Sequence, residues 1–338
     1  MWRVLVLLAS VLGVLGLVGG HPLGAQTCDP DGDVKFVCGT TNPEDLYSVP
    51  GAPWVIASGR YSASEGPVYA VSLGDHRVQE IFPAGALPPE HDRDTYRACP
   101  GPNNVFQPHG LTLREGGGDV HTLYVVGHGA REAIEVFALD VGGPVPAMKW
   151  IGCIPAPEGT ARINSITALP DGYLGATNFD RAGGELWEWH PTTGWVEVPG
   201  SRMPGPNGLV SSEDGQWFYI GGWSDRALVR LSRGQSPPRV DRIPVGFNVD
   251  NVRWGPAGKV IAAGHVTQCG DLDPCELSAA RVAEVDPTTF EVEQLVDYKG
   301  NEFFQVGTVA IEANDEIWIG GIRGSYGIAR FPRQESAP

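Results

Sequence analysis

The most regular feature of this sequence is a repeated unit of alternating apolar and polar positions. In each copy a polar residue opens a short apolar-alternating segment, a turn with Gly or Asp follows, and a second apolar segment comes after the turn. The copies cover residues 109–127, 164–178, 207–222, 250–264 and 307–321, with a weaker copy that includes residues 53–59. Such short alternating segments are typical of β-strands. One or two further apolar segments follow each unit, so the pattern predicts groups of three or four strands.

The spacing of the units predicts how these groups are arranged. Successive units open roughly 43 to 57 residues apart, which is the length of a four-stranded propeller blade. About six copies fit into the chain, no linker divides them, and no long segment of helical period occurs outside the N-terminus. The sequence therefore predicts an all-β fold, a six-bladed β-propeller formed as a single domain by residues 27–338. A β-sandwich would not need so regular a unit at this spacing.

The polar residues that open the units should meet in space. In a propeller the first strand of each blade lines the central channel, so residues that open these strands lie at one end of it. Residues far apart in the sequence are thereby expected to converge on one axis. They are His109, Asn164, Asn207, Asp250 and Asn251.

The oxygen-bearing members of this set predict a calcium site. Ca²⁺ takes six to eight oxygen ligands, which Asn and Asp side chains can supply. A further carboxylate is expected from the first blade, where Glu44 and Asp45 precede the apolar segment 53–59. The alternative is that these Asn and Asp residues only cap turns, as they often do. Five of them in the same phase favour the metal.

Two histidines add a second kind of chemistry. His109 opens the first complete unit, and His128 follows its second strand, so a strand out and back brings both to the same end of the channel. A histidine pair beside calcium suits the activation of water, with one ring taking the proton and the other relaying it. The alternative is that each ring only bonds a turn carbonyl. Further candidates for lining the pocket are His265, Trp223, Phe179 and Tyr326.

Composition and charge narrow the choice of partners. The chain contains 46 Gly and 29 Pro residues, which suits many short strands joined by tight turns, and its formal net charge is −16. Nucleic acid is therefore not expected as a partner, because phosphate binding needs a basic face. A cation suits such a surface better, although an acidic surface can also serve solubility alone.

The N-terminus and the cysteines indicate export. Residues 1–26 are expected to be a signal peptide, with Arg3 before a short apolar run; an uncleaved anchor is the alternative, and no further membrane span is expected. Six cysteines in an exported chain favour disulfides. Proximity predicts Cys28–Cys38 and Cys269–Cys275, which leaves Cys99–Cys153. The protein is expected to be secreted or periplasmic.

The ordered motifs PEDL, PHGL, VVGH, INSI, PNGL and VDNV match a known family. From about residue 43 to 330, the chain resembles the paraoxonases, which are calcium-dependent lactonases and arylesterases, and more distantly the gluconolactonase and strictosidine-synthase propellers. The resemblance implies His109 and His128 as the proton-transferring pair. It implies a catalytic calcium whose ligands are Glu44, Asn164, Asn207, Asp250 and Asn251.

The resemblance also implies a second, structural calcium, but with a departure. Its ligands would be Asp45, the carbonyl of Leu111 and the residue after Asn164, which is Ser165 here and an aspartate in the family. One carboxylate is therefore lost. The family also ties its N-terminal region to a cysteine near the C-terminus, and no cysteine follows Cys275 here.

These observations predict a calcium-dependent hydrolase of small lactones or aryl esters. Calcium would polarise the carbonyl group, and water activated by the histidine pair would attack it. No G-x-S-x-G motif, P-loop or dinucleotide fingerprint competes with this interpretation. The alternatives are a gluconolactonase-like hydrolase of sugar lactones and a non-catalytic propeller that uses the metal for rigidity.

Overall fold

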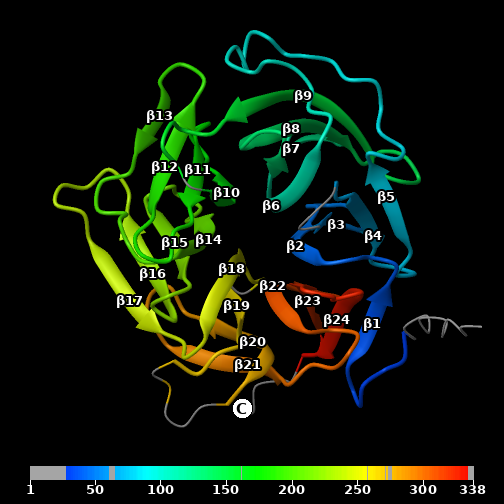
Figure 1. The fold of residues 1–338 in the computed structure, drawn as a ribbon, viewed down its shortest axis with the longest axis vertical. Helices are drawn as coiled ribbons and strands as arrows, with labels where there is room; N and C mark the ends of the chain where they lie inside the picture. The colour runs from blue at the N-terminus through cyan, green and yellow to red at the C-terminus, as the bar shows by residue number, and fades with distance from the viewer. Residues whose placement is uncertain are drawn as a thin grey trace, which may run out of the picture.

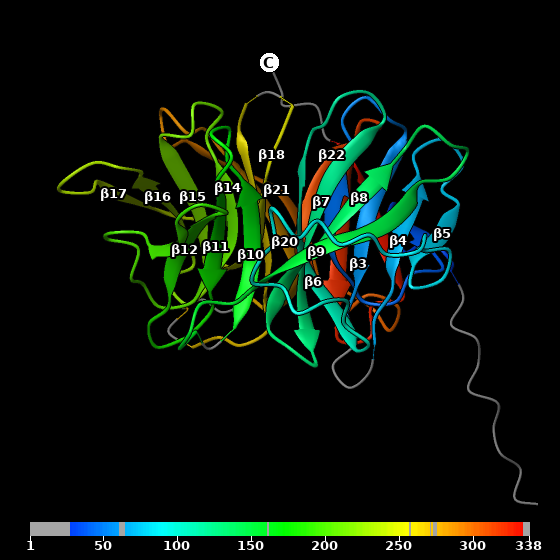
Figure 2. The same ribbon diagram turned by 90° about the horizontal axis from the view of Figure 1, so that it is seen from above.

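All regular secondary structure that the computed structural model describes is β-sheet. The structure describes residues 28–60, 65–160, 162–256, 258–270, 272 and 276–333. Their 24 strands form six four-stranded antiparallel sheets. The sheets stand around a central axis like the blades of a propeller (Figures 1 and 2). The predicted six-bladed β-propeller is therefore confirmed.

Each of the first five blades runs from the central channel outward in chain order. The first contains β2 (Pro43–Ser48), β3 (Trp54–Gly59), β4 (Val68–Ser72) and β5 (Val78–Phe82). The second contains β6 (Phe106–Arg114), β7 (Val120–Gly129), β8 (Ala133–Asp140) and β9 (Ala147–Pro155). The third contains β10 (Ile163–Ala168), β11 (Leu174–Asn178), β12 (Glu185–His190) and β13 (Gly194–Glu197).

The fourth and fifth blades follow the same order, and the sixth follows it for its first three strands. The fourth contains β14 (Pro206–Ser211), β15 (Trp217–Gly222), β16 (Ala227–Ser232) and β17 (Val240–Pro244). The fifth contains β18 (Asn248–Trp254), β19 (Val260–Val266), β20 (Ser278–Val285) and β21 (Val292–Tyr298). The sixth contains β22 (Val306–Ala313), β23 (Glu316–Ile322) and β24 (Gly327–Pro332), and its outer strand is β1 (Lys35–Cys38).

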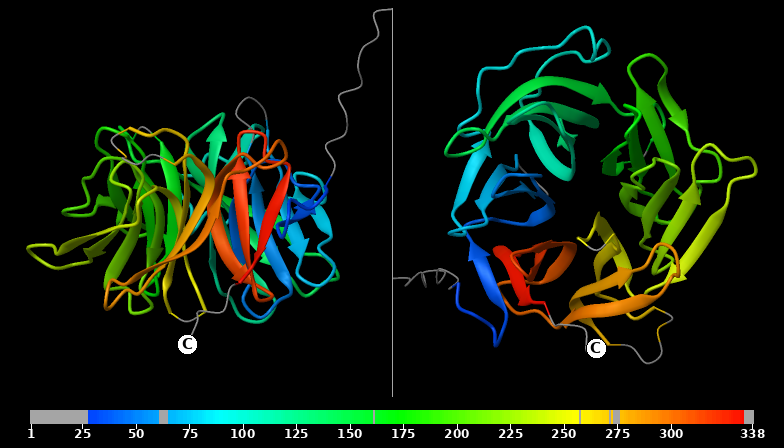
Figure 3. Two further views of the ribbon diagram at one scale, coloured as in Figure 1. Left: turned by 90° about the horizontal axis from the view of Figure 1, so that it is seen from below. Right: turned by 180° about the vertical axis from the view of Figure 1, so that it is seen from behind.

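The two ends of the described chain close the ring. Strand β1 pairs antiparallel with β24, from Lys35 opposite Arg330 to Cys38 opposite Gly327, and Figures 1 and 3 show the blue and red strands side by side. The Cys28–Cys38 disulfide holds the segment before β1 to its end. Because the sixth blade takes its outer strand from the beginning of the described residues, it is complete only when both ends of that stretch are present.

The first blade differs from its predicted form. The segment Pro43–Ser48 is itself the inner strand of that blade, and the apolar segment around Trp54–Gly59 is its second strand. Glu44 and Asp45 therefore lie inside a strand and not before one. The short polar sequence PEDLYS conceals the strand, because its inward carboxylates replace the apolar residues expected at buried positions.

A bulge interrupts every inner strand near its beginning. The register shifts between Pro43 and Asp45, Pro108 and Leu111, Ile163 and Ile166, Pro206 and Leu209, Val249 and Val252, and Gly307 and Val309. A bulge leaves a residue outside the ladder and re-aims its side chain. Each bulge contains a polar residue: Glu44, His109, Asn164, Asn207, Asp250 with Asn251, or Thr308.

Two glycines let neighbouring blades approach at these bulges. A Cβ atom on Gly110 would overlap the carbonyl oxygen of Asn164, and one on Gly208 would overlap the backbone of Asn251. Glycine is the residue that permits so close an approach of two backbones. The motifs PHGL and PNGL thus combine an inward polar side chain with the glycine that brings the next inner strand beside it.

The sheets pack on one another through apolar faces. Trp318, Phe137 and Phe218 are among the largest side chains that are fully buried between them. The Cys99–Cys153 disulfide ties the connection after β5 to β9, so two of the predicted pairings are confirmed. Cys269 is also disulfide-bonded, and its predicted partner Cys275 lies outside the described residues, as does the predicted leader, residues 1–26. Among the described residues no helix is long and apolar enough to cross a membrane.

Candidate functional site

Six polar side chains occupy the bulges of five inner strands at one end of the channel. They are each at most 7% exposed. The amide of Asn251 donates to Glu44 Oε1 at 3.2 Å, and Glu44 Oε1 lies 3.3 Å from His109 Nε2. Asp250 accepts a hydrogen bond from Asn207. The six side chains are Glu44, His109, Asn164, Asn207, Asp250 and Asn251.

Four oxygen atoms of this group are buried without a hydrogen-bond partner among the described residues. They are Glu44 Oε2, Asn164 Oδ1, Asn207 Oδ1 and Asn251 Oδ1. A buried acceptor left unpaired costs about 1–3 kcal/mol, so such atoms are uncommon unless something else satisfies them. Several converging oxygen atoms of carboxylates and amides are the donor set that Ca²⁺ prefers. The residues present therefore fit a hard cation.

The composition of the group also matters for which ion it suits. In the described part of the chain, no cluster of three or more His, Cys, Asp or Glu side chains could hold a metal ion. The candidate set has only two carboxylates, Glu44 and Asp250, and completes itself with three amides. A set of oxygen donors without imidazole or thiolate favours calcium over zinc or copper.

Burial makes the two carboxylates difficult to ionise together. Burial raises the pKa of Glu44, against the opposing charge of Arg60. Burial, and then the negative charge of Glu44, raise the pKa of Asp250 well above its ordinary value of 3.8. A divalent cation between them would remove this repulsion, because an opposite charge at short range favours the ionised form.

The histidine pair is continuous with a third acidic residue. His109 Nδ1 lies 2.9 Å from His128 Nε2, and His128 Nδ1 lies 2.7 Å from Glu132 Oε2. The other oxygen of Glu132 accepts the backbone N–H of Ile163 at 2.7 Å. Three side chains therefore form one line of hydrogen bonds that ends in a fixed carboxylate.

The donors along this line follow from Arg60. Its Nη1 lies 3.0 Å from His109 Nε2, and a guanidinium can only donate, so His109 Nε2 is the acceptor. The proton of His109 is then on Nδ1 and is donated to His128 Nε2. The proton of His128 is in turn on Nδ1 and is donated to Glu132. Both rings are neutral with the same tautomer.

Burial favours these neutral rings. It lowers the pKa of His109 well below its ordinary value of 6.5, and the charge of Arg60 acts in the same direction. Burial also lowers the pKa of His128, although the hydrogen bond from its ring to Glu132 opposes the shift. A neutral His109 with an unprotonated Nε2 can accept a proton at neutral pH.

The residues predicted for a second calcium do not fit that ion. The guanidinium of Arg253 contacts the carboxylate of Asp45 and lies 3.3 Å from the carbonyl oxygen of Leu111. Its Nε donates to the carbonyl of Leu46 at 3.0 Å. The hydroxyl of Ser165 accepts the backbone N–H of Leu209 at 3.2 Å. A side-chain cation thus already lies between the predicted ligands.

Asp45 is bonded from every side by groups of the chain. Its carboxylate also accepts the backbone N–H groups of Leu46 at 2.8 Å and Leu111 at 2.7 Å. Burial nevertheless raises the pKa of Asp45 to about 6, against the charge of Arg253. Asp45 and Arg253 are therefore a buried ion pair that joins the first, second and fifth blades.

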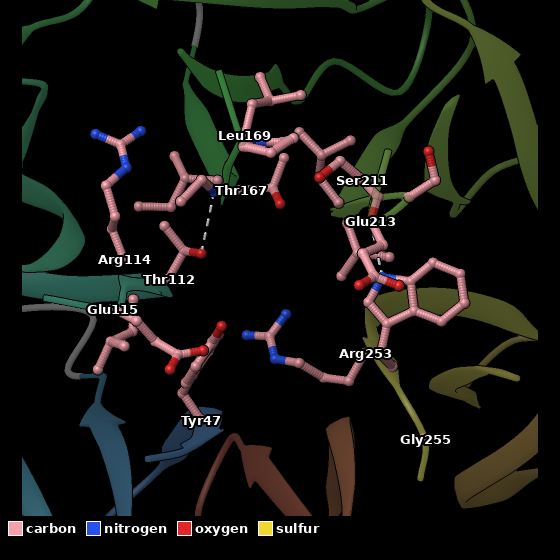
Figure 4. Close-up of a pocket in the computed structure, with 18 of the residues that line it drawn as sticks. Tyr47, Thr112, Arg114, Glu115, Thr167, Leu169, Ser211, Glu213, Arg253 and Gly255 are labelled. Atoms are coloured by element: carbon pink, nitrogen blue, oxygen red, sulfur yellow. Dashed lines mark hydrogen bonds between the residues drawn. The ribbon is translucent and has the colours of Figure 1, made fainter. Parts of the chain in front are cut away.

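Arg253 also faces a cavity on the far side from the histidine pair. This cavity, of about 930 Å³, is lined by the later residues of the inner strands, such as Tyr47, Thr112 and Ser211. In Figure 4, Arg253 points into it from the β18 side, opposite Thr112. The unpaired oxygens and the histidines lie at the other end of the channel, so the candidate site is at that end. Arg253 separates the candidate site from the cavity.

Aromatic residues form one wall near the candidate site. The ring of Trp223 lies 6.3 Å from that of Phe179 and 6.3 Å from that of His265. His265 Nδ1 lies 3.9 Å from Asp250 Oδ2 and bonds the carbonyl of Gly307 at 2.9 Å. Tyr326 instead packs on Phe303, with 6.2 Å between the ring centres.

Sequence reasoning missed Glu132, Arg60 and Arg253. Glu132 lies in the turn between β7 and β8, four residues after His128. The argument that placed His128 at this end of the channel therefore applies to Glu132 as well. Arg60 follows directly after β3, at the same end of the channel, which the blade pattern also implies. Arg253 follows Asn251 by two positions on the same strand face. Its partner is the Asp45 carboxylate, which the resemblance had assigned to calcium.

Comparisons with known proteins show the fold. No family model and no curated protein matches the sequence. A solved structure named as a candidate gluconolactonase is 15% identical, with a TM-score of 0.56 over 89% of this chain and 92% of its own. A luciferin-regenerating enzyme is 13% identical, with a TM-score of 0.55 over 88% and 94%. A candidate glucose dehydrogenase from Thermus thermophilus is 16% identical, with a TM-score of 0.51 over 88% and 98%.

Proposed function

We propose that the protein is a calcium-dependent hydrolase of lactones or aryl esters. One observation carries the proposal. Four unpaired buried oxygens, from Glu44 and three asparagines, belong to the same group as a neutral histidine whose Nε2 lies 3.3 Å from Glu44. A cation site next to a proton acceptor is the arrangement needed to hydrolyse a carbonyl compound with water.

The histidine line gives each side chain a separate task. His109 Nε2 takes the proton from the attacking water. The proton on Nδ1 can then pass to His128 Nε2, while His128 already donates to Glu132. The carboxylate of Glu132 stabilises positive charge on the pair, and Glu44 at 3.3 Å stabilises it on His109. The second of these steps is a proton transfer along a hydrogen bond that is already present.

The ligands proposed for the ion are Glu44, Asn164, Asn207, Asp250 and Asn251. When bound, calcium supplies a Lewis acid that polarises the carbonyl oxygen and stabilises the negative charge that develops there. Trp223 and Phe179 are proposed to contact the organic part of the substrate. We propose one ion for each chain, because Arg253 lies between the residues considered for a second.

A hydrolase of sugar lactones is the second candidate. The observation in its favour is the likeness of fold to the candidate gluconolactonase. It would use the same ligands and histidines, and it differs only in requiring a more polar wall. Disulfides such as Cys99–Cys153 suit an oxidising compartment, so we propose that either reaction takes place outside the cytoplasm, in secreted or periplasmic protein.

A substrate panel with and without a chelator tests the proposal. The wild-type protein should hydrolyse γ-lactones, aryl esters or sugar lactones, and activity should disappear with EGTA and return with calcium. Glu44→Gln should lose at least about 100-fold in kcat/KM, while Glu291→Gln on the exposed rim serves as the matched control. Equal rates for wild type and Glu44→Gln would refute the metal site. No hydrolysis of any substrate, with calcium bound, would favour a non-catalytic binding propeller.

A further inference from the structure

The candidate site of this acidic protein is flanked by arginines. The formal net charge of the chain is −16, yet Arg60, Arg162 and Arg181 all occur in connections at the end of the channel that holds the histidine pair. They come from different places in the chain: Arg60 follows β3, Arg162 precedes β10, and Arg181 follows β11. The concentration of cations at this one place needs a physical reason.

Arg60 lies directly on the proton acceptor. Its backbone N–H bonds the carbonyl of Asn42 at 2.9 Å, which fixes the residue at the top of the first blade. Its Nη1 donates to His109 Nε2 at 3.0 Å. That nitrogen is the atom that the proposed function requires to be free. Arg60 therefore occupies the proposed general base.

Arg162 is a second cation beside the same pair. It is one residue from Ile163, whose backbone N–H bonds Glu132, and its own carbonyl accepts the N–H of Phe179 at 2.8 Å. Its Nε is buried without a hydrogen-bond partner among the described residues. Its charge and that of Arg60 repel each other, and both charges also act on His109 and His128. Two like charges are thus held close together in a partly buried place.

The acidic groups nearby, Glu132 and Glu44, offset the charge of this pair only in part. Glu132 is bonded by His128 and by the N–H of Ile163, and Glu44 is part of the proposed metal ligand set. On the other side, Arg181 stacks on the ring of Trp223, with its guanidinium carbon 4.5 Å from the ring centre. An anionic group brought by a ligand would therefore meet cations that the chain itself leaves incompletely paired.

We propose that the substrate carries a carboxylate, which Arg60 binds with Arg162 beside it, and that this contact draws Arg60 away from His109. The inference rests on the proposed function and names its substrate class. A guanidinium matches a carboxylate with two parallel hydrogen bonds, whereas it has only one contact with an imidazole nitrogen. The carboxylate thus both places the substrate and frees the nitrogen that accepts the proton. A neutral lactone competes less well for Arg60, so it is hydrolysed more slowly.

A comparison of two substrates tests the inference. A γ-butyrolactone that bears a carboxylate and the same lactone that bears the carboxamide are hydrolysed by the wild-type protein with calcium. The kcat/KM ratio should favour the carboxylate by about 100-fold. Arg60→Gln should reduce that ratio to a few-fold, Arg60→Lys should give an intermediate ratio, and Arg239→Gln, on an exposed outer connection, should keep it. A ratio near one in the wild type, or one that Arg60→Gln leaves unchanged, would overturn the inference.

A binding measurement separates this inference from the proposed function. Cyclopentanone carboxylate and cyclopentanone carboxamide have no hydrolysable bond and are titrated into the calcium-loaded protein by calorimetry. The carboxylate should bind at least about 10-fold more tightly than the amide, and Arg60→Gln should remove the difference. This result supports the substrate class even if no lactone is hydrolysed. Equal binding of the two ketones overturns the substrate class even if neutral lactones are hydrolysed.

Discussion

His109 Nδ1 donates its proton to His128 Nε2 across 2.9 Å, and the direction of this hydrogen bond is fixed at both ends. Arg60 can only donate to the far nitrogen of His109, and Glu132 accepts from the far nitrogen of His128. The pair is therefore polarised toward Glu132. A proton that arrives at His109 Nε2 has a continuous line of hydrogen bonds along which its charge can be stabilised.

We expect the reaction to need both rings neutral, which sets its pH dependence. Burial lowers the pKa of His109 and of His128 below 6.5. Since the neutral form is the base, kcat/KM should be level at neutral pH and should fall only as the pH drops below 6.5, through the lowered values. A pH–rate profile checks this. An acid limb centred above pH 6.5 would contradict it.

Glu132→Gln should slow hydrolysis and move the acid limb. The carboxylate raises the pKa of His128 against the effect of burial, so its removal should lower that pKa further and shift the limb to lower pH. The rate at neutral pH should fall by about 100-fold, because positive charge on the pair loses its partner. Glu291→Gln is the control. A slower enzyme with an unshifted limb would mean that Glu132 acts only by packing.

Calcium should stabilise the folded protein through the unpaired oxygens. A ligand present at 100 times its Kd raises the free energy of unfolding by about 2.7 kcal/mol. The melting temperature should therefore rise with calcium concentration in the wild type, and much less in Asn207→Ala, whose Oδ1 is one of those atoms. Thermal melts in EGTA and in calcium measure the effect. Equal shifts in both proteins would remove Asn207 from the ligand set.

Metal analysis should find one calcium ion in each chain. Arg253 neutralises Asp45, so Arg253→Met should leave a buried carboxylate unpaired and lower the free energy of unfolding by about 3–5 kcal/mol. Arg253→Met combined with Asp45→Asn should lose less, because no buried charge remains alone. Denaturant unfolding compares the variants. Two ions bound by the wild type would show that Arg253 does not take the place of a second.

The disulfides Cys28–Cys38 and Cys99–Cys153 should contribute unequally to the free energy of unfolding. Cys99 and Cys153 are 54 residues apart, whereas Cys28 and Cys38 are 10 apart. From loop entropy, removal of the first pair should cost about 4 kcal/mol and removal of the second about 3 kcal/mol. Double Cys→Ala variants unfolded in denaturant test this order. A larger loss for the Cys28–Cys38 pair would show that holding β1 in place matters more than loop length.

The fold could be predicted because the blade unit repeats with its polar opening residue intact. The spacing of His109, Asn164, Asn207 and Asp250 indicated the number of blades and the end of the channel at which they lie. The inner strand Pro43–Ser48 was missed because carboxylates break its apolar alternation. Its role is visible only when the bulge turns Glu44 toward the axis.

The electrostatic partners in the site could not be predicted in the same way. Arg60 and Arg253 act through long side chains that reach across blade boundaries, and the blade pattern gives the position of a backbone but not the reach of a side chain. Asp45 illustrates the difficulty. Its position in the motif matches a family ligand, yet Arg253, 208 residues away, is the cation that it contacts.

The pairing of β1 with β24 has a consequence for biosynthesis and for protein engineering. Strand β1 is synthesised first in the described chain, but it can pair only after β24 has been synthesised. The ring of blades therefore cannot close on a partly synthesised polypeptide. Deleting residues 28–42 would expose an edge of β24, at the opposite terminus. A nick or a tag near β1 would therefore disturb β24, the last strand of the domain.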